Sequence, residues 1–370
     1  MTRRPRLTDL RLAGLGLSLA ALGRLSAEST RLVEWHRSKV LPRVAAVLQP
    51  ASGAVDTTLG EVAVVLLIGG CLAVIVKRRT KALGSLTFLL GAAVFSFYMS
   101  WGIAYQYPPL AVRLAPFPQL SEAASKARFA ELAESSARLV SRAAAGAPDF
   151  SGDSGELLRR IDAGLVEGFS RLPASIEASP IRGVRFGPVK FSRVSFAMSR
   201  LQLSGYYLPW SGEAQINADM TRTQWPRVAA HEKAHQRGFA RENEATVMGL
   251  LACLSSREPA VFYAGSLGLF VGFDRELAKA DRDARRRIWE MLPPRAVEDF
   301  QKEAAFWKSH EGAAGVVSEK VNDTYLKAQG VQSGVLSYGE TTRLILQAID
   351  TETLELKALL KDSRKPEVPE

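Results

Sequence analysis

A run of apolar residues at 84–105 carries no charged side chain. A helix of that length can cross the hydrocarbon core of a bilayer. Two shorter apolar runs precede it, at residues 12–23 and 62–76. We therefore predict that residues 1–105 form a membrane anchor with two or three transmembrane helices, at about 10–26, 58–76 and 83–105.

A basic segment, KRRTK at residues 77–81, joins the last two apolar runs. Under the positive-inside rule this loop is cytoplasmic, so the chain after residue 105 lies outside the cytoplasm. Residues 12–23 can be either a transmembrane helix or part of a signal peptide, because the arginines before them are typical of a signal peptide. Either interpretation leaves the downstream domain on the same side. We predict a multi-pass protein of the inner membrane, with the lipid bilayer as a partner and an extracytoplasmic domain.

Beyond the apolar runs, hydrophobic residues recur at helical spacing between charged ones, which is typical of amphipathic helices. Two segments, 184–196 and 203–208, place β-branched and aromatic residues at near-alternate positions, which predicts strands. The fold class is therefore α+β and mostly helical, with one domain over residues 106–360 and a disordered tail over 361–370. The expected helices of the domain are 121–145, 156–172, 274–289, 295–310, 322–328 and 338–360.

The composition excludes some classes of protein. The chain carries 48 Lys and Arg against 38 Asp and Glu, a formal net charge of +10. No nucleic-acid-binding motif accompanies this excess, so we predict no nucleic-acid partner and assign the surplus to anionic lipid headgroups. Cys71 and Cys253 both lie in apolar segments, and two such residues are too few for a disulfide framework or a thiolate zinc site.

The strongest chemical signal is the sequence HEKAH at residues 231–235. Residues four apart share one face of a helix, so His231 and His235 can both point an imidazole at one zinc ion. Glu232 then lies beside the water of such a site, where it can act as a general base. A site of this kind needs one more protein ligand and an open fourth position.

Two acidic residues compete for the role of third ligand. Gly238 can end the helix in a left-handed conformation, and Arg241 stands where metzincins carry their third histidine. A cation cannot bind zinc, which leaves Glu242 and Glu244 at the start of a predicted second helix, residues 242–253. That start resembles the Glu-x-x-Ala-Asn/Asp element of gluzincin-type peptidases. The resemblance implies that Glu242 binds the metal and that Glu244 orients a histidine, while Glu244 remains the alternative ligand.

A longer resemblance links the chain to the DUF3810 family of bacterial membrane-anchored HExxH proteins. It implies a zincin-like metallopeptidase domain with a small sheet beside the HExxH helix and Zn²⁺ as the cofactor. Thr246 departs from the pattern, because the related element carries Asn or Asp there. The segments that carry the likeness are 101–105, 205–217, 231–245, 321–328 and 334–339.

The remaining candidates concern the substrate. Tyr338 and Tyr325 lie in family-like segments and can donate to a developing oxyanion, and Glu213 and Asn217 can contact substrate or support a turn. Residues 206–210 are the candidate edge strand for an extended peptide. The predicted function is hydrolysis of a peptide or protein substrate outside the cytoplasm by a membrane-anchored zinc peptidase. The alternative is a non-catalytic scaffold or binding protein with a zincin fold.

Overall fold

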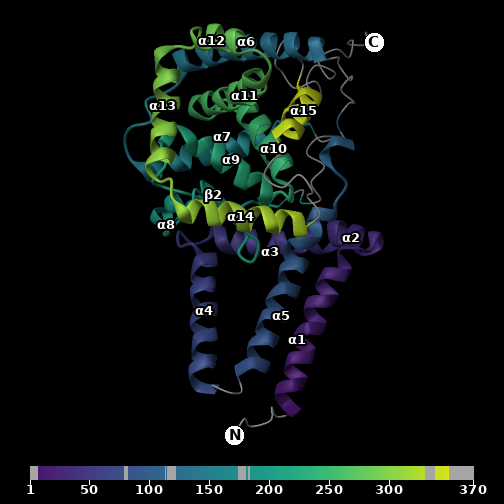
Figure 1. Cartoon of the computed structure of the whole chain (residues 1–370). Helices are drawn as coiled ribbons and strands as arrows, with labels where there is room; N and C mark the ends of the chain where they lie inside the picture. The colour runs from purple at the N-terminus through teal and green to yellow at the C-terminus, as the bar shows by residue number, and fades with distance from the viewer. Residues whose placement is uncertain are drawn as a thin grey trace, which may run out of the picture.

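The computed structural model describes residues 7–78, 82–112, 114, 122–173, 181, 184–329 and 338–349. A mostly helical domain carries long helices that project from one of its sides (Figure 1). These projecting helices are α1 (Leu7–Ser26), α4 (Leu59–Arg78) and α5 (Ala82–Ser100). The predicted tail, 361–370, and the basic residues 79–81 lie outside the described residues.

The projecting helices differ in how well they meet the requirements for a membrane span. Residues Leu59–Val76 of α4 have a mean hydropathy of 2.6 over 18 residues and are almost entirely exposed, so this helix is long and apolar enough to cross a bilayer. Helix α1 satisfies the same test only together with the following helices, from which it is bent by 86°. The apolar part of α5, Gly84–Ser100, is shorter. One or two spans are therefore supported by length and composition.

The predicted span 83–105 extends five residues beyond the C-terminal end of the observed helix. Helix α5 stops at Ser100, and the 3₁₀ helix η3 (Gly102–Gln106) follows it. Trp101 and Tyr105 are only 4 % exposed and pack against the domain. The end of the apolar run therefore belongs to the domain core, because these aromatic rings find protein partners there.

Helices α1 and α5 pack closely through glycines. A Cβ atom at Gly91 would collide with the carbonyl oxygen of Gly16, and one at Gly16 would collide with the backbone of Thr87. Small residues at such a crossing let two backbones approach, which is a common way for helices to associate in membranes.

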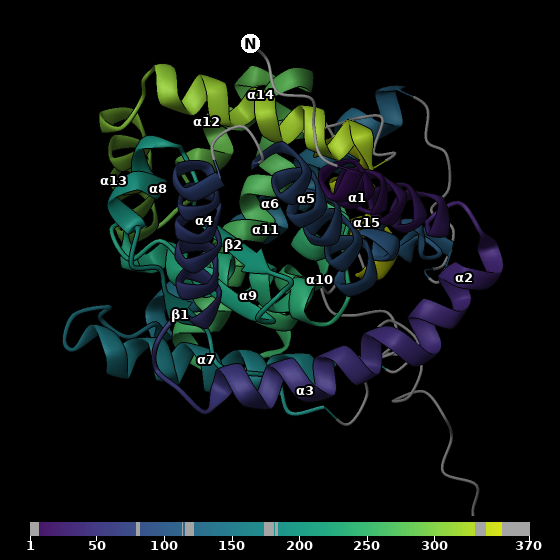
Figure 2. The same ribbon diagram turned by 90° about the horizontal axis from the view of Figure 1, so that it is seen from below.

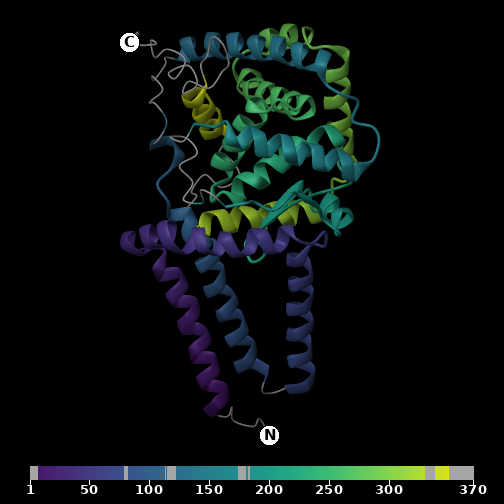
Figure 3. The same ribbon diagram turned by 180° about the vertical axis from the view of Figure 1, so that it is seen from behind.

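A segment that the sequence did not predict as helical crosses the ends of α1 and α5 (Figure 3). It consists of α2 (Thr30–Trp35), the π-helical η1 (His36–Val40) and α3 (Leu41–Gly53). His36 is fully buried; its Nε2–H donates to the Met99 carbonyl (2.8 Å) and its Nδ1 accepts from the Tyr107 hydroxyl (2.7 Å). Gln49 donates to the Gly212 carbonyl and accepts from the Gly187 amide. This segment therefore joins the projecting helices to the domain.

The small predicted sheet is present, with strand order β1-β3-β2. β1 runs parallel to β3 and β2 runs antiparallel to it. The predicted strand 203–208 is confirmed as β2, whereas 184–196 is wrong over most of its length. Ser192 and Ser195 bond to nearby backbone groups and turn the chain into α8 (Ser195–Arg200). The strands are β1 (Lys190–Phe191), β2 (Gly205–Leu208) and β3 (Glu213–Ile216).

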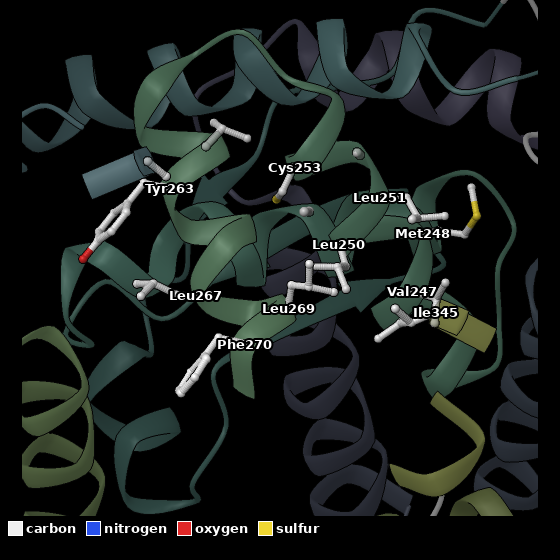
Figure 4. Packing of buried hydrophobic residues seen from close by; sticks show 14 of the residues in the cluster. Val247, Met248, Leu250, Leu251, Cys253, Tyr263, Leu267, Leu269, Phe270 and Ile345 are labelled. Atoms are coloured by element: carbon white, nitrogen blue, oxygen red, sulfur yellow. The ribbon is translucent and has the colours of Figure 1, made fainter. Parts of the chain in front are cut away.

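Helices make up the rest of the domain, and α10 and α11 contribute many of the residues of its core, part of which Figure 4 shows. The helices expected at 121–145, 156–172, 242–253 and 295–310 are present. The one expected at 274–289 is divided at Asp281, whose carboxylate accepts from the amides of Asp283 and Ala284 and so starts a new helix. The remaining helices of the domain are α6 (Glu122–Gly146), α7 (Ser154–Ser170), α9 (Trp225–Gln236), α10 (Glu242–Ser255), α11 (Pro259–Ala280), α12 (Arg282–Trp289), α13 (Pro294–Ser309), α14 (Ala313–Ala328) and α15 (Tyr338–Ala348).

Candidate metal centre

The HEKAH motif lies on α9, between the sheet on one side and α10 on the other. Pro226 stands in the first turn, where its missing N–H costs nothing. Lys233, the middle residue of the motif, is fully buried and pairs with Asp162 at 2.6 Å, which ties α9 to α7. At Gly249 a Cβ atom would come within 2.8 Å of the His231 amide nitrogen. Glycine therefore permits the close approach of α10 to α9.

The chain reverses after α9 and brings a carboxylate back to both histidines. Gly238 has φ +89, the left-handed conformation predicted for this turn. Glu242 then starts α10, with Oε2 3.1 Å from His231 Nε2 and Oε1 3.7 Å from His235 Nε2. One ligand atom from each of these three residues can be chosen so that all lie within 4.8 Å of one another.

Hydrogen bonds on the far side of each imidazole orient the histidines. The Nδ1–H of His235 donates to the Phe239 carbonyl at 2.6 Å. The Nδ1 of His231 lies 3.2 Å from the Thr246 hydroxyl, which itself donates to the Glu242 carbonyl and can therefore accept. Both Nε2 atoms consequently face Glu242 as unprotonated ligands in the neutral tautomer. Two imidazole nitrogens and one carboxylate are a donor set that fits zinc with an open fourth position.

The electrostatics of the cluster favour a bound cation. Burial lowers the pKa of His235, but the Glu242 carboxylate outweighs it, and the pKa rises to about 9. Burial opposes ionisation of Glu242, yet the two histidines hold its pKa well below the usual range. His235 is therefore protonated at neutral pH in the absence of a metal ion, and metal binding must displace that proton.

Glu232 is nearly fully buried beside the cluster. Burial raises its pKa, although the neighbouring histidines oppose the shift. A Cβ atom at Gly205, the first residue of β2, would lie 2.7 Å from its Oε1. Among the described residues none donates a hydrogen bond to this carboxylate. A carboxylate that is buried, basic and without a donor suits proton transfer.

Glu244 lies away from the histidines. Its Oε1 accepts from the Leu110 amide (2.9 Å) and from Arg241 (3.0 Å). Arg241 also donates to the carbonyls of Tyr105 and Tyr107, each at 2.9 Å. Glu244 and Arg241 therefore attach the start of α10 to the segment that follows α5, and the structure gives Glu244 contacts with neither imidazole.

The two residues predicted to contact substrate or support a turn, Glu213 and Asn217, are both buried, and Asn217 accepts from the Asp219 amide in a turn. Glu213 pairs with Lys190 at 2.6 Å and accepts from the amides of Leu59 and Gly60, the first residues of α4. Asn217 donates to Ser199 and to a backbone carbonyl. We assign both residues structural roles, with Glu213 stabilising the positive end of α4.

The two tyrosines predicted to stabilise an oxyanion lie on different helices. Tyr325, on α14, donates to the Tyr105 hydroxyl at 3.2 Å. Its pKa rises to about 12, first because of burial and then because of the charge of Glu242, to which it is close. Tyr338 begins α15, and its side chain lies outside the described residues.

Two aromatic residues that were not among the predicted site residues, Trp101 and Tyr207, lie beside His235. The Trp101 ring meets the His235 ring edge to face at a centroid distance of 5.6 Å. The Tyr207 ring, on β2, lies 6.3 Å from His235 and 4.7 Å from Trp101. The apolar run at 84–105 places Trp101 in a predicted membrane helix. Its contact with His235 follows only from the tertiary packing.

Residues 37–346 match the family described as "Protein of unknown function (DUF3810)". The match covers more than half of the chain and extends from η1 to α15, so the protein belongs to this family, as its resemblance predicted. No curated protein and no solved structure matches the chain.

Proposed function

We propose that this protein is a membrane-anchored, zinc-dependent peptidase. The observation that carries the proposal is the convergence of His231, His235 and Glu242, with both Nε2 atoms directed at the carboxylate, next to a buried Glu232 to which no described residue donates. This arrangement combines a zinc donor set with a general base.

The residues divide the chemistry between them. The chemistry that zinc supplies when bound is a water of lowered pKa and polarisation of a substrate carbonyl. Glu232 takes the proton of the attacking water and passes it to the leaving amine. Burial raises the pKa of Glu232, which makes the carboxylate a stronger base for the first transfer. Tyr325 is the described candidate for a donor to developing negative charge, and Tyr338 stays a second candidate.

An extended substrate would pair with β2. This strand is at one end of the sheet, and its first residue adjoins Glu232. Backbone pairing with a sheet edge holds a peptide extended without demanding a particular sequence. The peptide bond opposite Gly205 or Tyr207 would then lie beside the base.

We further propose that the domain lies outside the cytoplasm. The connection between α4 and α5 carries the basic residues of the 77–81 segment, and both helices lead from it toward the domain (Figure 1). The start of α1 lies at the same end of the molecule as this connection (Figure 1), and three arginines precede that helix in the sequence. The positive-inside rule assigns this end to the cytoplasm. A C-terminal fusion to alkaline phosphatase should be active, whereas an active cytoplasmic reporter at that position would reverse the topology.

The experiment that tests the catalytic proposal uses the full chain in detergent, because Trp101 and Tyr105 belong to the site region. The zinc content is measured by mass spectrometry. Hydrolysis is measured with a mixture of fluorogenic peptides. We expect one zinc per chain, lost in His235→Ala and Glu242→Ala and kept in the matched Glu244→Gln. Glu232→Gln should keep zinc and lose hydrolysis.

Other outcomes have definite meanings. Zinc that is retained in Glu242→Ala but lost in Glu244→Gln would identify Glu244 as the third metal ligand. Stoichiometric zinc without hydrolysis of any peptide in the mixture would support the non-catalytic scaffold. A well-folded chain that binds no zinc would refute the peptidase.

A further inference from the structure

The candidate metal centre lies at the end of the domain from which α1, α4 and α5 project. Trp101, whose ring packs against His235, is the residue directly after α5. Viewed from the side of the projecting helices, β2 and α9 lie between α4 and α5 (Figure 2). One aromatic side chain therefore separates the site from the end of an apolar helix.

Strand β2 leads from the site toward these helices. At its first residue, Gly205, it adjoins Glu232, and at its last residue, Leu208, it meets the first turn of α4. Two residues further on, the indole N–H of Trp210 donates to the Ser96 hydroxyl of α5 at 3.1 Å. In Figure 1 the turn that joins β2 to β3 lies between the upper ends of α4 and α5.

Trp210 contacts α5 close to the end of that helix that joins the domain. Its side chain is 43 % exposed and also contacts Phe97 of α5 edge to face, at a centroid distance of 6.4 Å. Partly exposed tryptophans with one hydrogen-bonded end are enriched at the interface between membrane and water. From Leu208 back to Gly205, the three residue steps of β2 cover about 10 Å, and Trp210 lies in the turn beyond the strand.

The outer edge of β2 has backbone groups free for pairing. The Asn217 amide donates to the Ser204 carbonyl, and the register continues this pairing at residues 206 and 208. In an antiparallel ladder the alternate residues, Gly205 and Tyr207, direct their N–H and C=O groups away from the partner strand. Within the described ranges no backbone group pairs with them.

We propose that the substrate is the juxtamembrane segment of another membrane-anchored polypeptide. It leaves the bilayer beside α5 and Trp210, pairs with the free edge of β2, and presents a peptide bond about three to six residues from the membrane surface to the site. Anchoring keeps the segment at the level of the edge and so raises its effective concentration there. This inference rests on the proposed peptidase for the cleavage, but the binding position follows from the strand alone.

The test measures binding position without hydrolysis, using the full-length Glu232→Gln variant in lipid vesicles. The probes are single-span peptides with about twenty apolar residues followed by an extended polar segment. One photoreactive residue is moved outward along this segment, one position per peptide, and crosslinks are mapped by mass spectrometry. A second set places the segment before the span, since either chain direction can pair with a strand edge.

We expect crosslinks to β2 to be at least tenfold stronger for positions about three to six than for positions beyond about ten. Trp210→Ala should shift or broaden this profile, and the matched Trp35→Ala, an exposed tryptophan on α2, should leave it unchanged. A flat profile, or no crosslinks to β2 from any anchored peptide, would overturn the inference.

The two proposals fail separately. A peaked crosslinking profile with a wild-type protein that hydrolyses nothing would support the binding position and refute the peptidase. Hydrolysis of soluble and anchored peptides at any distance from the span would support the peptidase and refute the juxtamembrane substrate.

Discussion

Replacing Gly205 with alanine should separate catalysis from metal binding. The added Cβ atom would lie 2.7 Å from Glu232 Oε1, 2.8 Å from Val228 Cγ1 and 2.9 Å from the Gln215 carbonyl. An ordinary contact needs at least 3.4 Å, so the carboxylate must retreat by about 0.7 Å or the strand must move away from α9. None of these atoms belongs to His231, His235 or Glu242.

The expected magnitude follows from this displacement. A catalytic group displaced by roughly 1 Å costs on the order of 100-fold in rate, and a shift of about 0.7 Å should cost roughly 10- to 100-fold in kcat/KM. Overpacking of this kind destabilises a fold by about 1–3 kcal/mol. Zinc stoichiometry should stay at one per chain.

The assay compares Gly205→Ala with Gly272→Ala on α11, where a Cβ atom would make only an ordinary 3.6 Å contact with Ile345. Zinc content, thermal unfolding and kcat/KM are measured for both full-length variants. Undiminished kcat/KM in Gly205→Ala would refute the placement of Glu232 as the base. Loss of zinc as complete as in His235→Ala would show that the strand supports the metal ligands instead.

Three further results are expected. Because His235 is protonated below its pKa of about 9, zinc affinity should fall about tenfold for each unit that pH drops from 8 to 6, measured by competition with a chelator; a constant affinity would contradict the proton displacement. Burial lowers the pKa of His36, so the unfolded state binds a proton more readily and stability should fall as pH drops below about 6.5; His36→Gln should reduce this slope in thermal unfolding. Glu213→Gln leaves the buried Lys190 ammonium without its carboxylate and should cost about 3–5 kcal/mol in chemical unfolding, whereas the exposed Glu298→Gln should cost nothing measurable. Equal losses would refute the structural role.

Local sequence patterns were sufficient to predict most helices and the histidine pair of the candidate metal centre. The turn at Gly238 and the two histidines of α9 depend on helix geometry and on one left-handed residue, both of which act within a few positions along the chain. The strands were harder to predict. β3 contains Glu213, which is buried only because Lys190 and the distant amides of Leu59 and Gly60 satisfy its carboxylate.

The sequence by itself determined the family, the mostly helical fold with a small sheet, and the pair of histidines with Glu232 between them. Only the tertiary structure decided that Glu242 and not Glu244 faces the imidazoles, because two acids in one helical turn point in different directions. It also decided that Thr246 orients His231 and that Trp101 packs on His235. These contacts join segments up to 134 residues apart, as the bond from Leu110 to Glu244 does, and no local pattern encodes such a distance.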